Sequence, residues 1–149
     1  MKSFQFTEHI KRPPRDVFAV IADPREATRF LDNITDSTKL TDGPIGVGST
    51  FRETRVVSGK QSSADLRITE YEPYTHVGVS TAAEGITVTY QYRLATEGEG
   101  TRLDWTCELD ADGLRRMMLP LVAAIMKKED GDHLQRLKVY IETQRDEPT

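Results

Sequence analysis

Over much of this chain, hydrophobic and polar residues alternate with a period of two, which is the pattern of strands that have one buried and one solvated face. The alternation is most regular in residues 86–94 and 102–109, on either side of a glycine-containing turn. Less regular segments of the same kind lie at 3–11, 34–41, 49–58, 61–71 and 75–82. The pattern predicts a seven-stranded antiparallel sheet with one face open to solvent.

Two short helices are predicted between the first and second strands. Pro14 suits the first turn of a helix over 15–22, in which apolar residues recur on one face. Asp23 and Pro24 then form a good cap and first residue for a second helix over 25–31.

The C-terminal segment, 112–143, has the longer period of an amphipathic helix. Asp112 is expected to cap this helix, Pro120 to bend it near its first turns, and the run 130–132 to weaken its middle. The apolar stripe of the helix runs through Leu114, Met117, Leu121, Met126, Leu134, Leu137 and Ile141. Because neither this helix nor the sheet can bury its apolar face alone, we expect a curved antiparallel sheet wrapped around a long C-terminal helix.

Composition and charge exclude several classes of protein. The net charge is −4 and no basic run exceeds two residues, which argues against nucleic-acid binding. The longest apolar stretch, 117–126, is too short to span a bilayer, and the N-terminus lacks the apolar block of a signal peptide. We therefore expect a cytoplasmic protein with no integral membrane segment.

The residues that most often hold metals or act as nucleophiles are sparse. Cys107 is the single cysteine, so no intrachain disulfide can form. Cys107 lies on the apolar face of its strand, which favours an inert buried thiol over a nucleophile. The three histidines, His9, His76 and His133, show no metal-ligand spacing and are expected at the surface or on a helix flank. We expect no metal and no cofactor.

Four stretches carry a resemblance to a known superfamily: IKRPPRDVFAVIADPREATRFL, GPIGVGSTFRE, ITEYEPYTHV and HLQRLKVYIE. With the order of elements, they resemble the helix-grip superfamily that is often called SRPBCC or START-like, and most closely its bacterial polyketide cyclase/dehydrase-like branch. The resemblance covers nearly the whole chain and implies one α+β helix-grip domain over residues 1–149. It also implies an apolar cavity between sheet and helix that binds lipids, sterols, polyketides or other hydrophobic molecules. The superfamily shares no catalytic motif, so no catalytic residue is assigned.

The glycines of GPIGVGSTFRE can be interpreted as a phosphate loop or as a turn. Gly46 and Gly48 match the first half of a dinucleotide-binding fingerprint, but Phe51 stands where the third glycine belongs. A strand follows these residues, whereas phosphate binding requires the N-terminus of a helix. The pattern therefore favours a turn that precedes the third strand.

Two charged residues follow that turn, and the pattern leaves their orientation open. If Phe51 faces the cavity, the period of two brings Glu53 and Arg55 into it as well. There they can anchor a carboxyl, keto or phenol group of a ligand, with Glu53 as a candidate general base. The alternative is a bulge or an edge position that exposes both, because the opposite face of this strand is scarcely more apolar.

The remaining cavity candidates are hydrophobic or aromatic. Tyr90, Tyr92 and Trp105 either pack in the core or line the cavity with a polar atom available to a ligand. Asp130 and His133 border the cavity if the drifting stripe of the helix passes through Asp130. The full set of candidate ligand-binding residues is Phe51, Glu53, Arg55, Leu66, Ile68, Val79, Val88, Tyr90, Tyr92, Leu103, Trp105, Met117, Leu121 and Met126.

The sequence thus favours binding of a hydrophobic small molecule by a carrier or sensor, either as a monomer or as a homodimer. One alternative is a polyketide cyclase/aromatase-like enzyme that steers enolisation and dehydration with polar residues of the cavity. A second alternative is a stress or partner-interaction protein. A convergent set of acid and base groups in the cavity would favour the enzyme.

Overall fold

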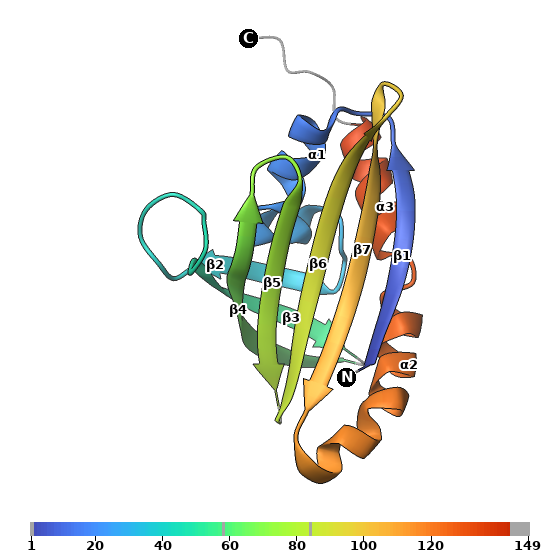
Figure 1. Cartoon of the computed structure of the whole chain (residues 1–149). Coiled ribbons are helices and arrows are strands. Elements are labelled where there is room, and N and C mark those ends of the chain that lie inside the picture. Colours follow the sequence, from blue (N-terminus) through green and yellow to red (C-terminus); the bar gives the residue numbers. More distant parts are fainter. Residues whose placement is uncertain (1, 58, 84, 144–149) are drawn as a thin grey trace.

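The computed structural model describes residues 2–57, 59–83 and 85–143 (Figure 1). Its elements are β1 (Lys2–Ile10), α1 (Pro14–Ile21), the 3-10 helix η1 (Pro24–Arg29), β2 (Ile34–Lys39), β3 (Thr50–Val57), β4 (Lys60–Glu72), β5 (His76–Ala83), β6 (Ile86–Glu97), β7 (Gly100–Ala111), the 3-10 helix η2 (Gly113–Met118), α2 (Leu119–Glu129) and α3 (His133–Thr143). The predicted seven strands, short helices and C-terminal helical segment are confirmed, and the arrangement is that of the helix-grip fold.

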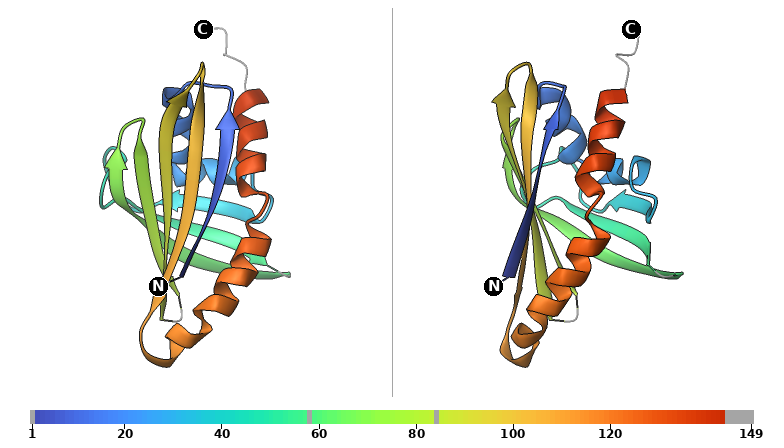
Figure 2. Two further views of the ribbon diagram at one scale, coloured as in Figure 1. Left: turned by 45° about the vertical axis from the view of Figure 1, so that its right-hand side comes forward. Right: turned by 90° about the vertical axis from the view of Figure 1, so that its right-hand side faces the viewer.

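The strands form one antiparallel sheet in the order β1-β7-β6-β5-β4-β3-β2. Bulges interrupt the pairing between Ile34 and Asp36 in β2 and between Ile68 and Glu70 in β4. Bulges bend strands and increase twist, and β2 and β3 accordingly run across the direction of β5, β6 and β7 (Figure 1). The sheet is therefore curved, and its concave side faces α3 and the short helices (Figure 2).

Alternation along the strands places the core on this concave side. In β7, Leu103, Trp105, Cys107 and Leu109 are buried. Tyr92 of β6 pairs in register with Trp105, so the aromatic residues of the two strands adjoin. Burial raises the pKa of the Cys107 thiol to about 12, mainly by desolvation, which keeps the thiol protonated and inert.

The glycine-containing loop before β3 is a turn. Gly43 and Gly48 have φ of 87° and 93°, which favours glycine, and the Gly48 N–H donates to the Ile68 carbonyl at 2.9 Å. No helix follows this loop, because β3 begins at Thr50. The interpretation of these glycines as a turn is confirmed.

The C-terminal segment is helical but not continuous. The weak point predicted at 130–132 separates α2 from α3, and Pro120 lies in the first turn of α2. Asp112 precedes η2 but makes no side-chain capping hydrogen bond, so that expected cap is wrong. Asp23 does cap η1, since its carboxylate accepts from the Arg25 backbone N–H at 3.0 Å. In the described part of the chain, no helix combines the length and apolar character needed to cross a membrane.

The apolar stripe of this segment is buried only in its second half. In α3, Leu134, Leu137 and Ile141 are buried as predicted. Leu114 and Met117 in η2 are instead exposed, as is Leu121 in α2. η2 and the start of α2 extend beyond the ends of β6 and β7, so no strand lies there to cover them (Figure 2).

Candidate functional site

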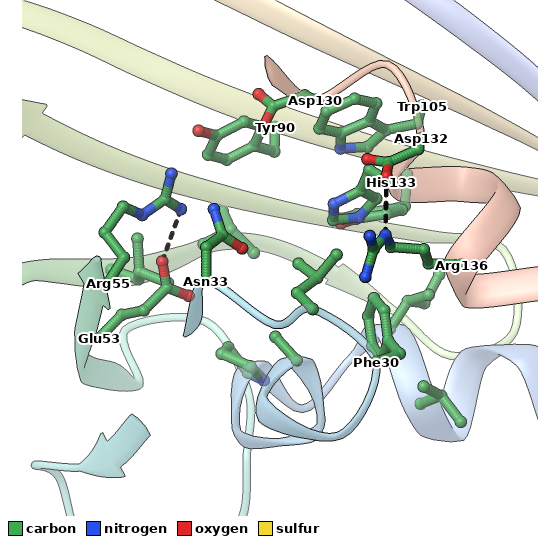
Figure 3. Close-up of a pocket in the computed structure, with 18 of the residues that line it drawn as sticks. Phe30, Asn33, Glu53, Arg55, Tyr90, Trp105, Asp130, Asp132, His133 and Arg136 are labelled. Carbon is green, nitrogen blue, oxygen red and sulfur yellow. Dashed lines mark hydrogen bonds and ion pairs between the residues drawn. The ribbon is translucent and has the colours of Figure 1, made fainter. Parts of the chain in front are cut away.

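A cavity of about 260 Å³ lies between the concave side of the sheet, η1 with the loop that follows it, and the junction of α2 and α3 (Figure 3). This volume is close to the lower end of the range for small-molecule pockets, which is roughly 300–1,000 Å³. Half of the fourteen sequence-predicted residues line it: Glu53, Arg55, Leu66, Val79, Tyr90, Tyr92 and Trp105.

The other seven candidates lie outside the lining. Three are fully buried in the core, namely Phe51, Ile68 and Leu103. Two are partly buried and pack against it, namely Val88 and Met126. Met117 and Leu121 are 78% and 61% exposed, and their expected place in the cavity is wrong. The physical reason lies in the orientation of α2, which turns Leu119 and Ala123 inward and the side bearing Leu121 outward.

Glu53 and Arg55 both point into the cavity from β3. Phe51 is fully buried, and the period of two carries both charges to the same side of the strand. An Arg55 Nη donates to Glu53 Oε1 at 2.8 Å. Burial lowers the pKa of Arg55, but the charge of Glu53 and the hydrogen bond to it raise that pKa above its ordinary value overall. Arg55 therefore keeps its positive charge inside the cavity, and its pairing with the Glu53 carboxyl group offsets the cost of burying that charge.

Asp130 lies at the break between α2 and α3 and borders the cavity beside the same pair. Desolvation raises its pKa to about 6, while the positive charge of Arg55 opposes that rise. Figure 3 shows the Asp130 carboxylate near the ring of Tyr90, with Arg55 extending from β3. A carboxyl group with a pKa near neutrality can exchange a proton at physiological pH.

Three flat side chains form one wall of the cavity. The rings of Tyr90 and Trp105 stack at 5.7 Å with 7° between planes, and those of Trp105 and His133 stack at 4.5 Å with 4°. Within the part of the chain that the structure describes, the buried Trp105 Nε1 has no hydrogen-bond partner. Most buried donors in folded proteins have a partner, so this one is an exception.

His133 is held in its neutral form. Its Nε2 lies 2.9 Å from the hydroxyl oxygen of Tyr92. Burial, followed by the charge of Arg55, lowers the pKa of His133 to about 4, and burial raises the pKa of Tyr92. A neutral imidazole and a protonated phenol therefore share this hydrogen bond. Of the two placements considered for His133, the one at the border of the cavity holds, and the one at the surface is wrong.

The rim of the cavity is polar and acidic. Arg136 of α3 donates through Nε to Asp132 at 2.7 Å and through Nη1 to Asp32 at 2.9 Å. The contact to Asp32 links α3 to the loop after η1, and both residues line the cavity. Figure 3 shows the contact to Asp132. Among the described residues, six carboxylates and two guanidinium groups line the cavity: Asp23, Asp32, Glu53, Glu129, Asp130, Asp132, Arg55 and Arg136. The cavity thus has a negative potential overall.

Comparison with known families agrees with this geometry. The sequence profile of the family described as polyketide cyclase / dehydrase and lipid transport matches residues 1–142. The chain belongs to this family. No curated protein matches the chain in sequence.

Similarity to solved structures shows that the protein has the START/SRPBCC fold. The Zhui aromatase/cyclase from Streptomyces sp. R1128 is 17% identical with a TM-score of 0.76, covering 95% of this chain and 93% of its own. A START superfamily protein from Mycobacterium smegmatis is 11% identical with a TM-score of 0.76, covering 94% and 97%. At these identities the similarity concerns the fold alone, which is START-like.

Several residues that line the cavity could not be identified from the sequence. Phe30 and Asn33 follow η1 in an irregular segment that has no hydrophobic period, and Asp32 and Arg136 meet across 104 positions. The one signal in the sequence was the helix-weakening run 130–132, which marks the point where α2 and α3 bring Asp130 and His133 to the cavity. In the described part of the chain, no group of three His, Cys, Asp or Glu side chains is placed to hold a metal ion.

Proposed function

We propose that the protein binds a compact, uncharged hydrophobic molecule that carries a keto or phenol group, as a carrier or sensor of that molecule. The observation that supports this proposal most strongly is the Glu53–Arg55 pair inside a cavity that has aromatic and apolar walls and a polar, acidic rim. Ligand pockets typically combine such walls with a few polar groups that orient the ligand.

The charges of the cavity favour a neutral ligand over a carboxylate. Arg55 has five N–H donors in a fixed fork, and Glu53 engages one of its nitrogen atoms. A carbonyl oxygen can accept from the remaining donors. A carboxylate would meet the same donors but also the excess of negative groups in the lining, including Glu53 and Asp130.

The aromatic wall supports a flat ligand. Tyr90, Trp105 and His133 present nearly parallel rings, against which a planar ring system can stack. The volume of about 260 Å³ suits a ring system of this kind better than a long acyl chain.

Isothermal titration with two matched probes tests this proposal. We expect 2-acetylnaphthalene, a neutral ketone, to bind at least about tenfold more tightly than 2-naphthoate, its anionic counterpart. Arg55→Met is expected to weaken binding of the ketone by about tenfold or more, because a charge-assisted hydrogen bond is lost. Arg52→Met, on the opposite face of the same strand, is the matched control. Tighter binding of naphthoate, or equal binding of the ketone by Arg55→Met and wild type, would contradict the proposal.

A second candidate function is catalysis of a cyclisation, and the raised pKa of Asp130 beside Arg55 favours it. We propose that Asp130 removes a proton from a methylene between two keto groups, and that Arg55 stabilises the enolate oxygen. The enolate carbon then attacks a second keto carbon of the same chain and closes the ring, and the new alkoxide takes back the proton from Asp130. Loss of that hydroxyl with a proton from the adjacent carbon, as water, introduces a double bond. The step needs no oxidant. Asp130→Asn should abolish turnover of a poly-keto thioester while leaving its binding within about twofold, and turnover at the wild-type rate would refute this role.

A further inference from the structure

One surface of the protein exposes more apolar area than a solvated helix normally does. On η2 and α2, Leu114, Met117, Met118, Leu121 and Ile125 are between 50% and 83% exposed. Leu114, Met117, Leu121 and Ile125 recur at spacings of three or four residues, which places them along one side of the helical segment, and Met118 adjoins Met117. We call these five residues the exposed apolar face.

Among the residues that the structure describes, no neighbouring element covers this face. The other side of α2 packs against the core, where Leu119 and Ala123 are buried. η2 and the start of α2 project beyond the end of the sheet, so the face is convex and lies at one extremity of the molecule (Figures 1 and 2). A contiguous apolar surface on a soluble domain commonly marks an interaction site.

The charges around the face indicate which partner it fits. Residues 113–128 contain Arg115, Arg116, Lys127 and Lys128 and no acidic residue, and all four basic side chains are exposed. The segment therefore carries +4, and since the whole chain carries −4, the rest of it carries −8. Such a polarised charge distribution turns the segment towards a negative surface and the rest of the molecule away from it.

We propose that the exposed apolar face docks on an anionic lipid bilayer, with the basic residues at the headgroups and the apolar side chains below them. Amphipathic helical segments with basic flanks lie in the membrane interface in this way. A bilayer accepts a convex face without needing a matching groove, and flexible methionines such as Met117 and Met118 adapt to it. A second copy of the chain fits less well, because pairing two such faces brings four positive charges against four.

This inference goes beyond the proposed ligand and does not depend on it. α2 carries part of the docked face and ends directly before Asp130, which lines the cavity, so the cavity lies close to the bilayer. A hydrophobic molecule dissolved in the bilayer would then be near the cavity that receives it.

Vesicle co-sedimentation tests the proposal with the full chain. The wild-type protein should bind vesicles of phosphatidylcholine and phosphatidylglycerol in equal parts at low salt, leave them at high salt, and not bind pure phosphatidylcholine. Met117→Ser with Leu121→Ser should weaken binding at least about tenfold. Lys127→Gln with Lys128→Gln should weaken it by roughly thirty-fold.

Matched variants elsewhere on the surface separate the loss of vesicle binding from a general loss of surface hydrophobicity, of positive charge or of folding. Val47→Ser with Val139→Ser removes comparably exposed apolar side chains, and Lys60→Gln with Arg93→Gln removes two other exposed charges. Both control variants should bind as wild type does, and circular dichroism should show equal melting for all. The proposal is overturned if wild type does not bind anionic vesicles, if the controls lose binding equally, or if light scattering shows a dimer that Met117→Ser with Leu121→Ser dissociates.

Discussion

Replacement of Arg55 by Met should destabilise the fold more than an ordinary surface change, because it leaves a carboxylate in the cavity without its partner. Glu53 is only 7% exposed, and its 2.8 Å contact to Arg55 is what offsets its burial. Breaking a fully buried ion pair costs about 3–5 kcal/mol. The Arg55 side chain is 33% exposed, so water reaches part of the site and we expect about 2 kcal/mol.

A double-mutant cycle separates the pair from its surroundings. Glu53→Gln alone should cost about 1 kcal/mol, and Glu53→Gln with Arg55→Met should cost no more than the single change at Arg55, because no charge then remains unpaired. The free energies of unfolding come from urea titrations at pH 7. The cycle should therefore give a coupling energy of about 1–2 kcal/mol.

The exposed pair Arg52–Asp65 is the matched control, since its arginine belongs to the same strand, β3, and pairs on the solvent side with Asp65 of the neighbouring strand β4. The two side chains are 56% and 50% exposed and lie 3.0 Å apart. Their coupling should be about 0.5 kcal/mol or less. Additive effects at Glu53 and Arg55, or coupling no larger than that of the control, would refute the claim that the cavity pair acts as a buried unit.

Other predictions concern titration, packing and the loop before β3. The folded pKa of His133 is about 4, below its ordinary 6.5, so its contribution to stability is lost as pH falls from about 6.5 to 4. The folded pKa of Asp130 is about 6, above 3.8, so its contribution is lost as pH rises from about 4 to 6. In the wild type these two effects of pH on the free energy of unfolding oppose each other. Between pH 4 and 6.5, stability should rise more steeply with pH in Asp130→Asn and fall with pH in His133→Phe. An unchanged pH dependence in the two variants would contradict both assignments. Leu137→Ala, at a fully buried position of α3, should cost about 2–5 kcal/mol in urea unfolding against about 0.5 kcal/mol or less for the exposed Val139→Ala; equal costs would contradict the packing. Gly48→Ala should cost about 1–2 kcal/mol in the same assay, since φ there is 93°, and a neutral effect would show that the turn can relax.

The strands could be predicted from the sequence because the alternation in β6 and β7 reports directly which side chains are buried. The inward orientation of Arg55 could not be predicted, because both faces of β3 carry charged residues and the pattern alone does not fix the register. Pairing with β4 fixes it: Phe51 lies opposite Leu66 and both are buried, which carries Glu53 and Arg55 to the concave side.

The helical half of the site was harder to predict. The period of the C-terminal segment shows which residues share a side, but not where the sheet ends. Met117 and Leu121 therefore share the pattern of Leu134 and yet lie in solvent. The position of His133 depends on the break before α3 and on the stacking with Trp105, which no local pattern contains.

Native mass spectrometry of the freshly purified protein tests the central claim, that the cavity holds a hydrophobic molecule oriented by Arg55, most directly. We expect the wild-type spectrum to contain the chain with a bound small molecule of uncharged, polar-substituted ring type, which is released on collisional activation. The occupancy should fall in Arg55→Met and persist in Arg52→Met. A wild-type spectrum that shows only the bare chain, or equal occupancy in the two variants, would contradict the account.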